Sequence, residues 1–170
     1  GLLAFQRLGR LGFDDFASRV PIRRVYEPNA ANRAGYDGMS AQLAHAIAQM
    51  KKTLLIDADM RRPMVHRAKK IEQPRPGLAA LMTGEATFAE AFEEMEDGLH
   101  VIPSGTVPAN PLELLSSQRF KDLIAKMQET YDVIIIDSAP ALAVSDALVV
   151  AQLADAQLFV IRADATPYQA

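Results

Sequence analysis

Short apolar stretches recur along the second part of the chain. Four of them, at 53–57, 99–103, 132–137 and 156–164, have the length and the continuous hydrophobicity of strands that are buried on both faces of a sheet. Helical patterns separate these stretches, so we expect crossover connections and a mostly parallel sheet that is covered on both sides. The pattern therefore predicts a doubly wound α/β domain.

The segments between the strands have the spacing of amphipathic helices. Leu115, Phe120 and Ile124 fall on one face of such a segment, which is typical of a helix that packs against a sheet. The prolines of 105–111 indicate a loop. Helices are predicted at 41–50, at 112–131, at 145–155 with Ser145 as the N-cap, and as two short helices within 77–98 that are broken near Gly84.

Composition places the chain among ordinary globular proteins. Its 170 residues are 49% hydrophobic and 23% charged, which suits one domain with a sizeable core. We therefore expect residues 1–170 to form a single domain. A net charge of −3 gives no electrostatic reason to expect nucleic acid as a partner.

Several other classes of site find no support in the sequence. The chain has no cysteine, which excludes thiolate metal sites and fits a reducing compartment. The histidines at 45, 66 and 100 lack the spacing of zinc ligands. No apolar run is long enough to cross a membrane, and no signal peptide is visible. The chain begins without an initiator methionine, so we expect it to be a piece of a longer protein.

Carboxylates gather where two of the predicted strands end. Asp57 and Asp59 follow one apolar run, and Asp137 ends another. Ligands of open parallel sheets bind beyond the carboxyl ends of the strands, so we expect these three side chains to converge there. Three converging carboxylates would suit Mg²⁺, which prefers oxygen ligands and shares them with phosphates. The alternative is that each acid only caps the turn or helix that follows it.

Two arginines follow the first pair of acids, in the stretch TLLIDADMRRP. Charge clustered at a strand end is more typical of a functional site than of a plain turn, so Arg61 and Arg62 are candidate site residues. The alternative is a solvated basic face that they share with Arg67, Lys69 and Lys70.

Three segments resemble the bacterial tyrosine kinases that control polysaccharide polymerisation and export. LLIDADMRRP (54–63) is similar to the family's second phosphate-site motif, Walker A′, and YDVIIIDSAP (131–140) is similar to its Walker B motif. IPSGTVPANPLELLSSQRFKDLI (102–124) is similar to a connecting segment that has no generic reason to recur in other nucleotide-binding domains. The resemblance extends from Gln42 to Ala163 and implies a P-loop NTPase-like fold of the deviant Walker A type.

The resemblance also implies a role for each residue at the strand ends. Asp57 and Asp59 would be catalytic, with Asp57 orienting or deprotonating the attacking tyrosine. Asp57, Asp59 and Asp137 would hold Mg²⁺, and Asp137 would also lie beside the nucleotide, ATP. Arg61 would act in catalysis and Arg62 in nucleotide binding, by neutralising phosphate or by contacting a neighbouring subunit.

The expected phosphate-binding loop departs from the family's pattern. GYDGMSAQLAHAIAQM (35–50) aligns without a gap to the family's loop and helix, so Gly35, Tyr36 and Asp37 take the nucleotide-binding positions. Tyr36 replaces the lysine and Asp37 replaces the Ser or Thr, which removes a positive charge and adds a negative one beside the phosphates. We therefore expect weak or absent ATP binding. PIRRVYEPN (21–29) is the candidate for the strand that precedes the loop.

The two ends of the chain also differ from the resembled family. LLAFQRLGRLGF (2–13) resembles a helix that carries a Glu-x-x-Arg-x-x-Arg oligomerisation signature, and Leu3, Gln6 and Gly9 stand at its charged positions. Tyr168 lies near the end without the cluster of tyrosines that the family carries in its tail. We therefore expect the last elements of the fold and the tyrosine tail to be missing from this sequence.

Three functions are compatible with these patterns. The first, which the resemblance implies, is an autophosphorylating, ATP-dependent protein-tyrosine kinase domain that regulates capsule or exopolysaccharide polymerisation. It would work in the cytoplasm at the inner face of the membrane, with a membrane polysaccharide co-polymerase as its activator and with self-association as a further expectation. The second is a catalytically impaired scaffold of the same fold, which the altered loop favours and the intact aspartates oppose. The third is a partitioning-type ATPase, which would need an early loop lysine and a terminal amphipathic helix, and neither is visible.

Overall fold

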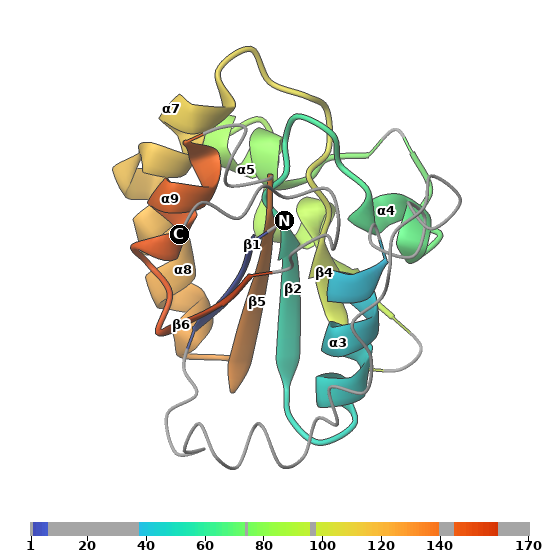
Figure 1. Cartoon of the computed structure of the whole chain (residues 1–170). Coiled ribbons are helices and arrows are strands. Elements are labelled where there is room, and N and C mark those ends of the chain that lie inside the picture. The colour runs from blue at the N-terminus through green and yellow to red at the C-terminus, as the bar shows by residue number, and fades with distance from the viewer. Residues whose placement is uncertain (1, 7–37, 74, 96–97, 140–144, 160–170) are drawn as a thin grey trace, which may run out of the picture.

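The computed structural model describes residues 2–6, 38–73, 75–95, 98–139 and 145–159. These residues form one sheet with helices on both of its faces (Figure 1). The strands are β1 (Leu2–Gln6), β2 (Thr53–Asp57), β3 (Glu93–Glu94), β4 (His100–Ile102), β5 (Val133–Ser138) and β6 (Ala156–Phe159). The helices are α3 (Met39–Ala48), α4 (Val65–Ala68), α5 (Leu78–Thr83), α6 (Phe88–Ala91), α7 (Pro111–Ser116), α8 (Gln118–Gln128) and α9 (Asp146–Ala151).

The centre of the sheet is parallel, as the sequence predicts. The strand order is β3-β4-β2-β5-β1-β6, and β2 pairs in parallel with both β4 and β5. Strand β1 pairs antiparallel with β5 and with β6, so β6 runs in the direction of the central strands. Strand β3 is antiparallel to β4. The predicted doubly wound, mostly parallel α/β fold is therefore confirmed, with β1 and β3 running against it.

The first strand corrects the sequence-based prediction. A helix was expected over 2–13, but Leu2–Gln6 is a strand that lies between β5 and β6. A short run that is apolar at nearly every position fits a buried strand as well as a buried helix, so its periodicity does not distinguish the two. Its pairing with β5 shows that it is a strand. Residues 7–13 and the strand expected at 21–29 lie outside the described residues.

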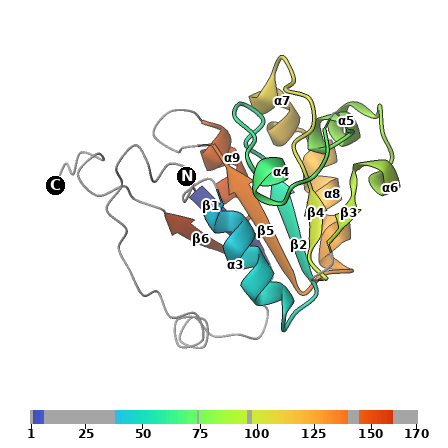
Figure 2. The same cartoon turned by 90° about the vertical axis from the view of Figure 1, so that its right-hand side faces the viewer.

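Alternate residues of the central strands pack on opposite faces of the sheet. One face carries α3 over a core that includes Leu55, Val101, Val133 and Ile135. The other face carries α5 and α8 over Leu54, Ile56, Ile134 and Ile136, with Phe120 fully buried among them. In Figure 2, α3 crosses in front of the central strands. This alternation explains why β2 and β5 are apolar along their length.

Most predicted helices are present, and one is divided. Residues 112–131 were expected to form one helix, but the chain breaks at Ser117, whose backbone is extended and whose hydroxyl accepts the N–H of Phe120. A serine that can cap the next helix favours this break. Gly84 ends α5 in the left-handed conformation, as expected. Ser145 takes the N-cap position of α9, but its side chain makes no capping hydrogen bond.

Candidate functional site

Asp57 and Asp137 lie side by side at the carboxyl ends of β2 and β5. They are direct partners in the parallel register, and the N–H of Ala58 donates to the carbonyl of Asp137 at 2.7 Å. Each lies two residues beyond a core residue of the face that α3 covers, so both side chains are on that face. The expected convergence of the two strand-end acids is confirmed.

The carboxylate of Asp57 is buried and only half satisfied. Its exposure is 0%, and its Oδ2 accepts the N–H of Val65 in the first turn of α4 at 3.2 Å. Its Oδ1 is buried without a hydrogen bond of good geometry among the described residues, although the backbone N–H of Asp59 is near enough to the carboxylate to lower its pKa slightly. A capping role, the alternative for this acid, therefore accounts for one oxygen of Asp57 and leaves the other unexplained.

Burial and neighbouring negative charges raise the cost of ionising both acids. Burial, and then the charge of Asp137, hold the pKa of Asp57 well above its usual range. Burial raises the pKa of Asp137 to about 6, and the charge of Asp59 adds to the rise. Two like charges in a low-dielectric environment disfavour the doubly ionised state. A cation placed between them would offset both effects.

Asp59 is close to this pair and is used in a turn. Its Oδ1 accepts the backbone N–H groups of Arg61 at 3.1 Å and Arg62 at 3.0 Å. Its charge raises the pKa of both strand-end acids. In the part of the chain that the structure describes, no three acidic or histidine side chains form a group that could hold a metal ion. The protein thus provides a pair of acids, Asp57 buried and Asp137 partly buried, with Asp59 near them.

The acid of β5 has a partner that sequence reasoning missed. Ser40, in the first turn of α3, is 3% exposed and donates its hydroxyl to Oδ2 of Asp137 at 3.1 Å. Helix α3 begins at Met39, with Gly38 as its N-cap. Gly38, Met39 and Ser40 have the Gly-x-Ser spacing of a phosphate loop, three residues after the aligned Gly35, and this spacing was the signal that could have identified Ser40.

Arg61 makes an ion pair that the sequence did not reveal. Its Nε donates to Oδ2 of Asp146 at 2.7 Å, and its Nη2 donates to Oδ1 at 3.0 Å. Asp146, the first residue of α9, is fully buried. The sequence suggested only that a helix begins there. Arg61 is therefore held at the carboxyl edge of the sheet by a residue of the segment that follows β5.

Of the remaining predicted site residues, Arg62 is described by the structure and three are not. Arg62 is exposed, and its side chain has no polar partner among the described residues. Gly35, Tyr36 and Asp37 lie outside the described residues, so their place in a loop stays a prediction.

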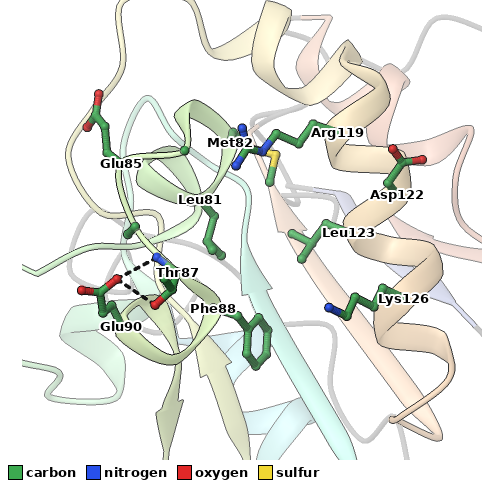
Figure 3. Close-up of a pocket in the computed structure, with 12 residues that line it drawn as sticks. Leu81, Met82, Glu85, Thr87, Phe88, Glu90, Arg119, Asp122, Leu123 and Lys126 are labelled. Carbon is green, nitrogen blue, oxygen red and sulfur yellow. Dashed lines mark hydrogen bonds between the residues drawn. The ribbon is translucent and has the colours of Figure 1, made fainter.

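A cavity of about 530 Å³ lies away from this edge, between the α5–α6 corner and α8 (Figure 3). Leu81, Phe88 and Leu123 form part of its apolar lining, and Arg119 and Lys126 reach it from α8. None of the predicted site residues lines it. The candidate site is therefore the carboxyl edge of β2 and β5.

None of the helices that the structure describes has the length and apolar character to cross a membrane.

Comparison with known proteins adds a family to this geometry. The model of a family described as an AAA domain matches residues 34–170. The chain is 40% identical over 134 residues to the tyrosine-protein kinase ptk of Acinetobacter johnsonii, covering 78% of this chain and 18% of that protein. It is 37% identical over 147 residues to the tyrosine-protein kinase YwqD of Bacillus subtilis, covering 85% of this chain and 62% of the relative. The chain therefore spans less than two thirds of either relative.

Solved structures agree with the sequence relatives. The kinase domain of VpsO superimposes with a TM-score of 0.67 at 41% identity, over 68% of this chain and 58% of that chain. The septum site-determining protein MinD of Pyrococcus horikoshii superimposes with a TM-score of 0.59 over 77% of this chain and 53% of that chain. Its identity is 19%, so this second likeness shows the fold alone.

Proposed function

We propose that the chain is the nucleotide-binding domain of an ATP- and Mg²⁺-dependent protein-tyrosine kinase. It belongs to the bacterial tyrosine kinases, and it matches the model of the AAA-domain family. One observation carries the proposal. Asp57 is fully buried next to the partly buried Asp137, and Oδ1 of Asp57 has no partner among the described residues. A fold rarely keeps such an arrangement unless a ligand completes it.

The donor set fits Mg²⁺. Asp137 and the unpartnered oxygen of Asp57 are the hard oxygen ligands that this cation takes, and Asp59 is near enough to contribute through its charge. A cation held there would neutralise the charge that develops on the transferred phosphoryl group. The hydroxyl of Ser40 keeps Asp137 oriented toward this position. Few protein ligands are needed, because Mg²⁺ usually keeps several waters and phosphate oxygens.

In this proposal Asp57 orients and deprotonates the attacking tyrosine hydroxyl. A raised pKa makes a carboxylate a stronger base near neutral pH, and burial supplies that shift. Arg61 and Arg62 would neutralise phosphate oxygens, with Arg61 held in place by Asp146. Gly35, Tyr36 and Asp37 would lie beside the nucleotide. Loss of the lysine and hydroxyl at Tyr36 and Asp37 would make ATP binding weak, because a charge-assisted contact to phosphate is missing.

That loss also favours a second candidate function, a catalytically impaired scaffold of the same fold. The altered loop supports it, whereas the acid pair at the strand ends supports the kinase, because a scaffold has no use for two neighbouring carboxylates with raised pKa values. In either case we propose that the natural context is capsule or exopolysaccharide export. A membrane co-polymerase chain would then hold the domain at the inner face of the cell membrane, and self-association is part of the same proposal.

Titration calorimetry with ATP, with and without Mg²⁺, combined with phosphorylation of a tyrosine peptide, tests the proposal. We expect Mg²⁺-dependent binding that is weaker than micromolar and slow phosphorylation that Asp57→Asn removes. Mg²⁺-dependent binding without any phosphoryl transfer would favour the scaffold. Binding of ATP that is independent of both Mg²⁺ and Asp137 would contradict the site itself. Arg67→Gln, at an exposed arginine of α4, is the matched control.

A further inference from the structure

The ion pair between Arg61 and Asp146 joins the two segments that leave the strands of the acid pair. Arg61 follows β2, and Asp146 begins α9 after β5. The two residues are 85 positions apart, so their contact depends on the pairing of β2 with β5. The charge of Asp59 acts on Arg61 as well, which places the guanidinium close to the candidate site.

The geometry of this pair leaves part of the guanidinium free. Asp146 takes Nε at 2.7 Å and Nη2 at 3.0 Å. The remaining terminal nitrogen, Nη1, has no partner among the described residues, and the Arg61 side chain is 42% exposed. Asp146, by contrast, is buried. A buried carboxylate thus binds Nε and Nη2 of Arg61, while Nη1 is available to a ligand.

We propose that Asp146 is a positioning residue, which holds Arg61 so that Nη1 can donate to a phosphate oxygen of a ligand at this edge. The inference rests on the proposed function, because it takes that ligand to be a phosphate ester. A long arginine side chain loses conformational freedom when it binds an anion, and an ion pair that exists beforehand has already removed part of that freedom.

The residue types fit positioning better than stability alone. A buried ion pair is often no more stabilising than apolar residues of the same volume, so its presence is weak evidence of a structural role. Arginine offers a planar fork that one carboxylate can fix while a second anion is bound, and lysine, a point charge, cannot do both with a defined orientation.

Magnesium pyrophosphate is the probe, because it carries the anion without requiring phosphoryl transfer. Wild type, Arg61→Gln, Asp146→Asn and the double variant are titrated while the arginine Nε–H signals are followed by NMR. We expect the Arg61 signal to shift in wild type and this shift to disappear in Asp146→Asn. Each single variant should bind about five- to tenfold more weakly, the factor of one partly exposed charge-assisted contact, and the double variant should bind no more weakly than either.

Arg67→Gln on α4 is the control and should leave both the affinity and the Arg61 signal unchanged. Because Arg61→Gln leaves Asp146 buried without its counter-charge, Arg61→Lys is measured beside it, and Asp146→Glu beside Asp146→Asn. Arg61→Lys keeps the charge but loses the two-point contact, so it should also lose part of the affinity. Circular dichroism of each variant checks that it is folded.

Three results would overturn the inference. They are no binding of pyrophosphate by the wild type, an Arg61 signal that ignores the bound anion, and an Asp146→Asn effect that adds to that of Arg61→Gln. The last is what a purely structural acid would give. If the pyrophosphate results are as expected but no tyrosine is phosphorylated, the kinase proposal fails and the positioning role stands. If tyrosine is phosphorylated while the Arg61 NMR signal does not respond to pyrophosphate, the positioning role fails and the kinase proposal stands.

Discussion

Buried polar groups are hydrogen-bonded at the amino end of the central strands and are incompletely hydrogen-bonded at the carboxyl end. At the amino end, the buried Tyr131 hydroxyl contacts Nδ1 of His100 at 2.8 Å, and the buried Thr53 hydroxyl donates to the carbonyl of Lys51 at 2.8 Å. At the carboxyl end, Asp57 keeps an oxygen without a partner among the described residues, beside a second acid. The same strands thus have one end that is satisfied by the protein and one that is not.

This difference separates structural polarity from functional polarity. A satisfied hydroxyl or imidazole adds specificity and a little stability. Neighbouring buried carboxylates cost stability unless something outside the protein compensates them. Local rules are broken mainly where function requires it, so the contrast directs attention to the carboxyl end. Each of the following predictions would break or sharpen that contrast.

The largest effect is expected from Asp57→Asn. The variant keeps an oxygen for the N–H of Val65 but loses the base, so tyrosine phosphorylation should fall by at least about a hundredfold, the lower end for a general base. ATP affinity should fall much less than the transfer rate, because Asp137 and the phosphate oxygens can still hold the cation. Phosphorylation rates and calorimetry on one preparation measure both. A variant that keeps most of its transfer rate would make Asp57 a structural cap like the polar groups at the other end.

The next effect concerns the missing phosphate grip. Tyr36→Lys with Asp37→Ser restores the aligned loop, whereas Met39→Lys places lysine directly before Ser40, the hydroxyl that contacts Asp137. The pair of restored contacts should strengthen ATP binding by about two orders of magnitude or more, because each charge-assisted contact is worth roughly 1.5–3 kcal/mol. Met39→Lys alone should give about one to two orders if α3 carries the loop in the shifted register.

Calorimetry with ATP and Mg²⁺ separates the two registers. Gln49→Lys, which adds the same charge at the far end of α3, is the control. A gain from Tyr36→Lys with Asp37→Ser and none from Met39→Lys confirms the aligned loop. The opposite result means that Gly38, and not Gly35, is the loop glycine. No gain from either set would show that the segment before α3 does not hold phosphate.

A smaller effect is expected on stability as a function of pH. The pKa of Asp137 is about 6 in the folded chain, above its value in an unfolded one, so the folded state binds the proton more tightly. Its contribution is therefore fully present below about pH 4 and is lost as pH rises through about 6, a change of roughly 3 kcal/mol at most. Urea unfolding of wild type and Asp137→Asn at pH 5 and 7 measures it. The variant should lose less stability over this interval.

The smallest effect is expected at the amino end. Tyr131→Phe removes the contact with His100 and should lower the free energy of unfolding by about 0.5–1.5 kcal/mol, the usual worth of one hydrogen bond. Binding of Mg²⁺ and ATP should not change. An effect of Tyr131→Phe on Mg²⁺ binding would end the division between the two ends of the sheet.

The carboxyl edge was predictable because its signals are local. An apolar run that ends in an acid gives both the strand and the position of the carboxylate, so the order of residues alone is enough to bring Asp57 and Asp137 to the same edge. The parallel centre of the sheet followed from the helices between the strands. Gly84, with its left-handed backbone, was equally readable.

Long-range contacts were not predictable in this way. Asp146 reads only as the start of a helix, and its pairing with Arg61 depends on which strands become neighbours. The contact of Ser40 with Asp137 joins residues 97 positions apart. The helix expected at β1 came from the resemblance of residues 2–13 to a family helix and was wrong, since an apolar run of five residues has no period that could have corrected it. Ser117 breaks a helical pattern that is continuous in the sequence, since its hydroxyl satisfies the next helix.

The central claim is that Asp57 and Asp137 form a cation site that the protein leaves uncompensated. Calorimetric titration with Mg²⁺ at pH 6, in buffers of different ionisation enthalpy, tests it most directly because it counts released protons. Both acids should release protons when the cation binds, more at pH 6 than at pH 8, because burial raises the pKa of both. With a pKa of about 6 for Asp137, Asp137→Asn should lower the count at pH 6 by about half a proton. Absence of Mg²⁺ binding, or binding with the same proton count in Asp137→Asn, would contradict the account.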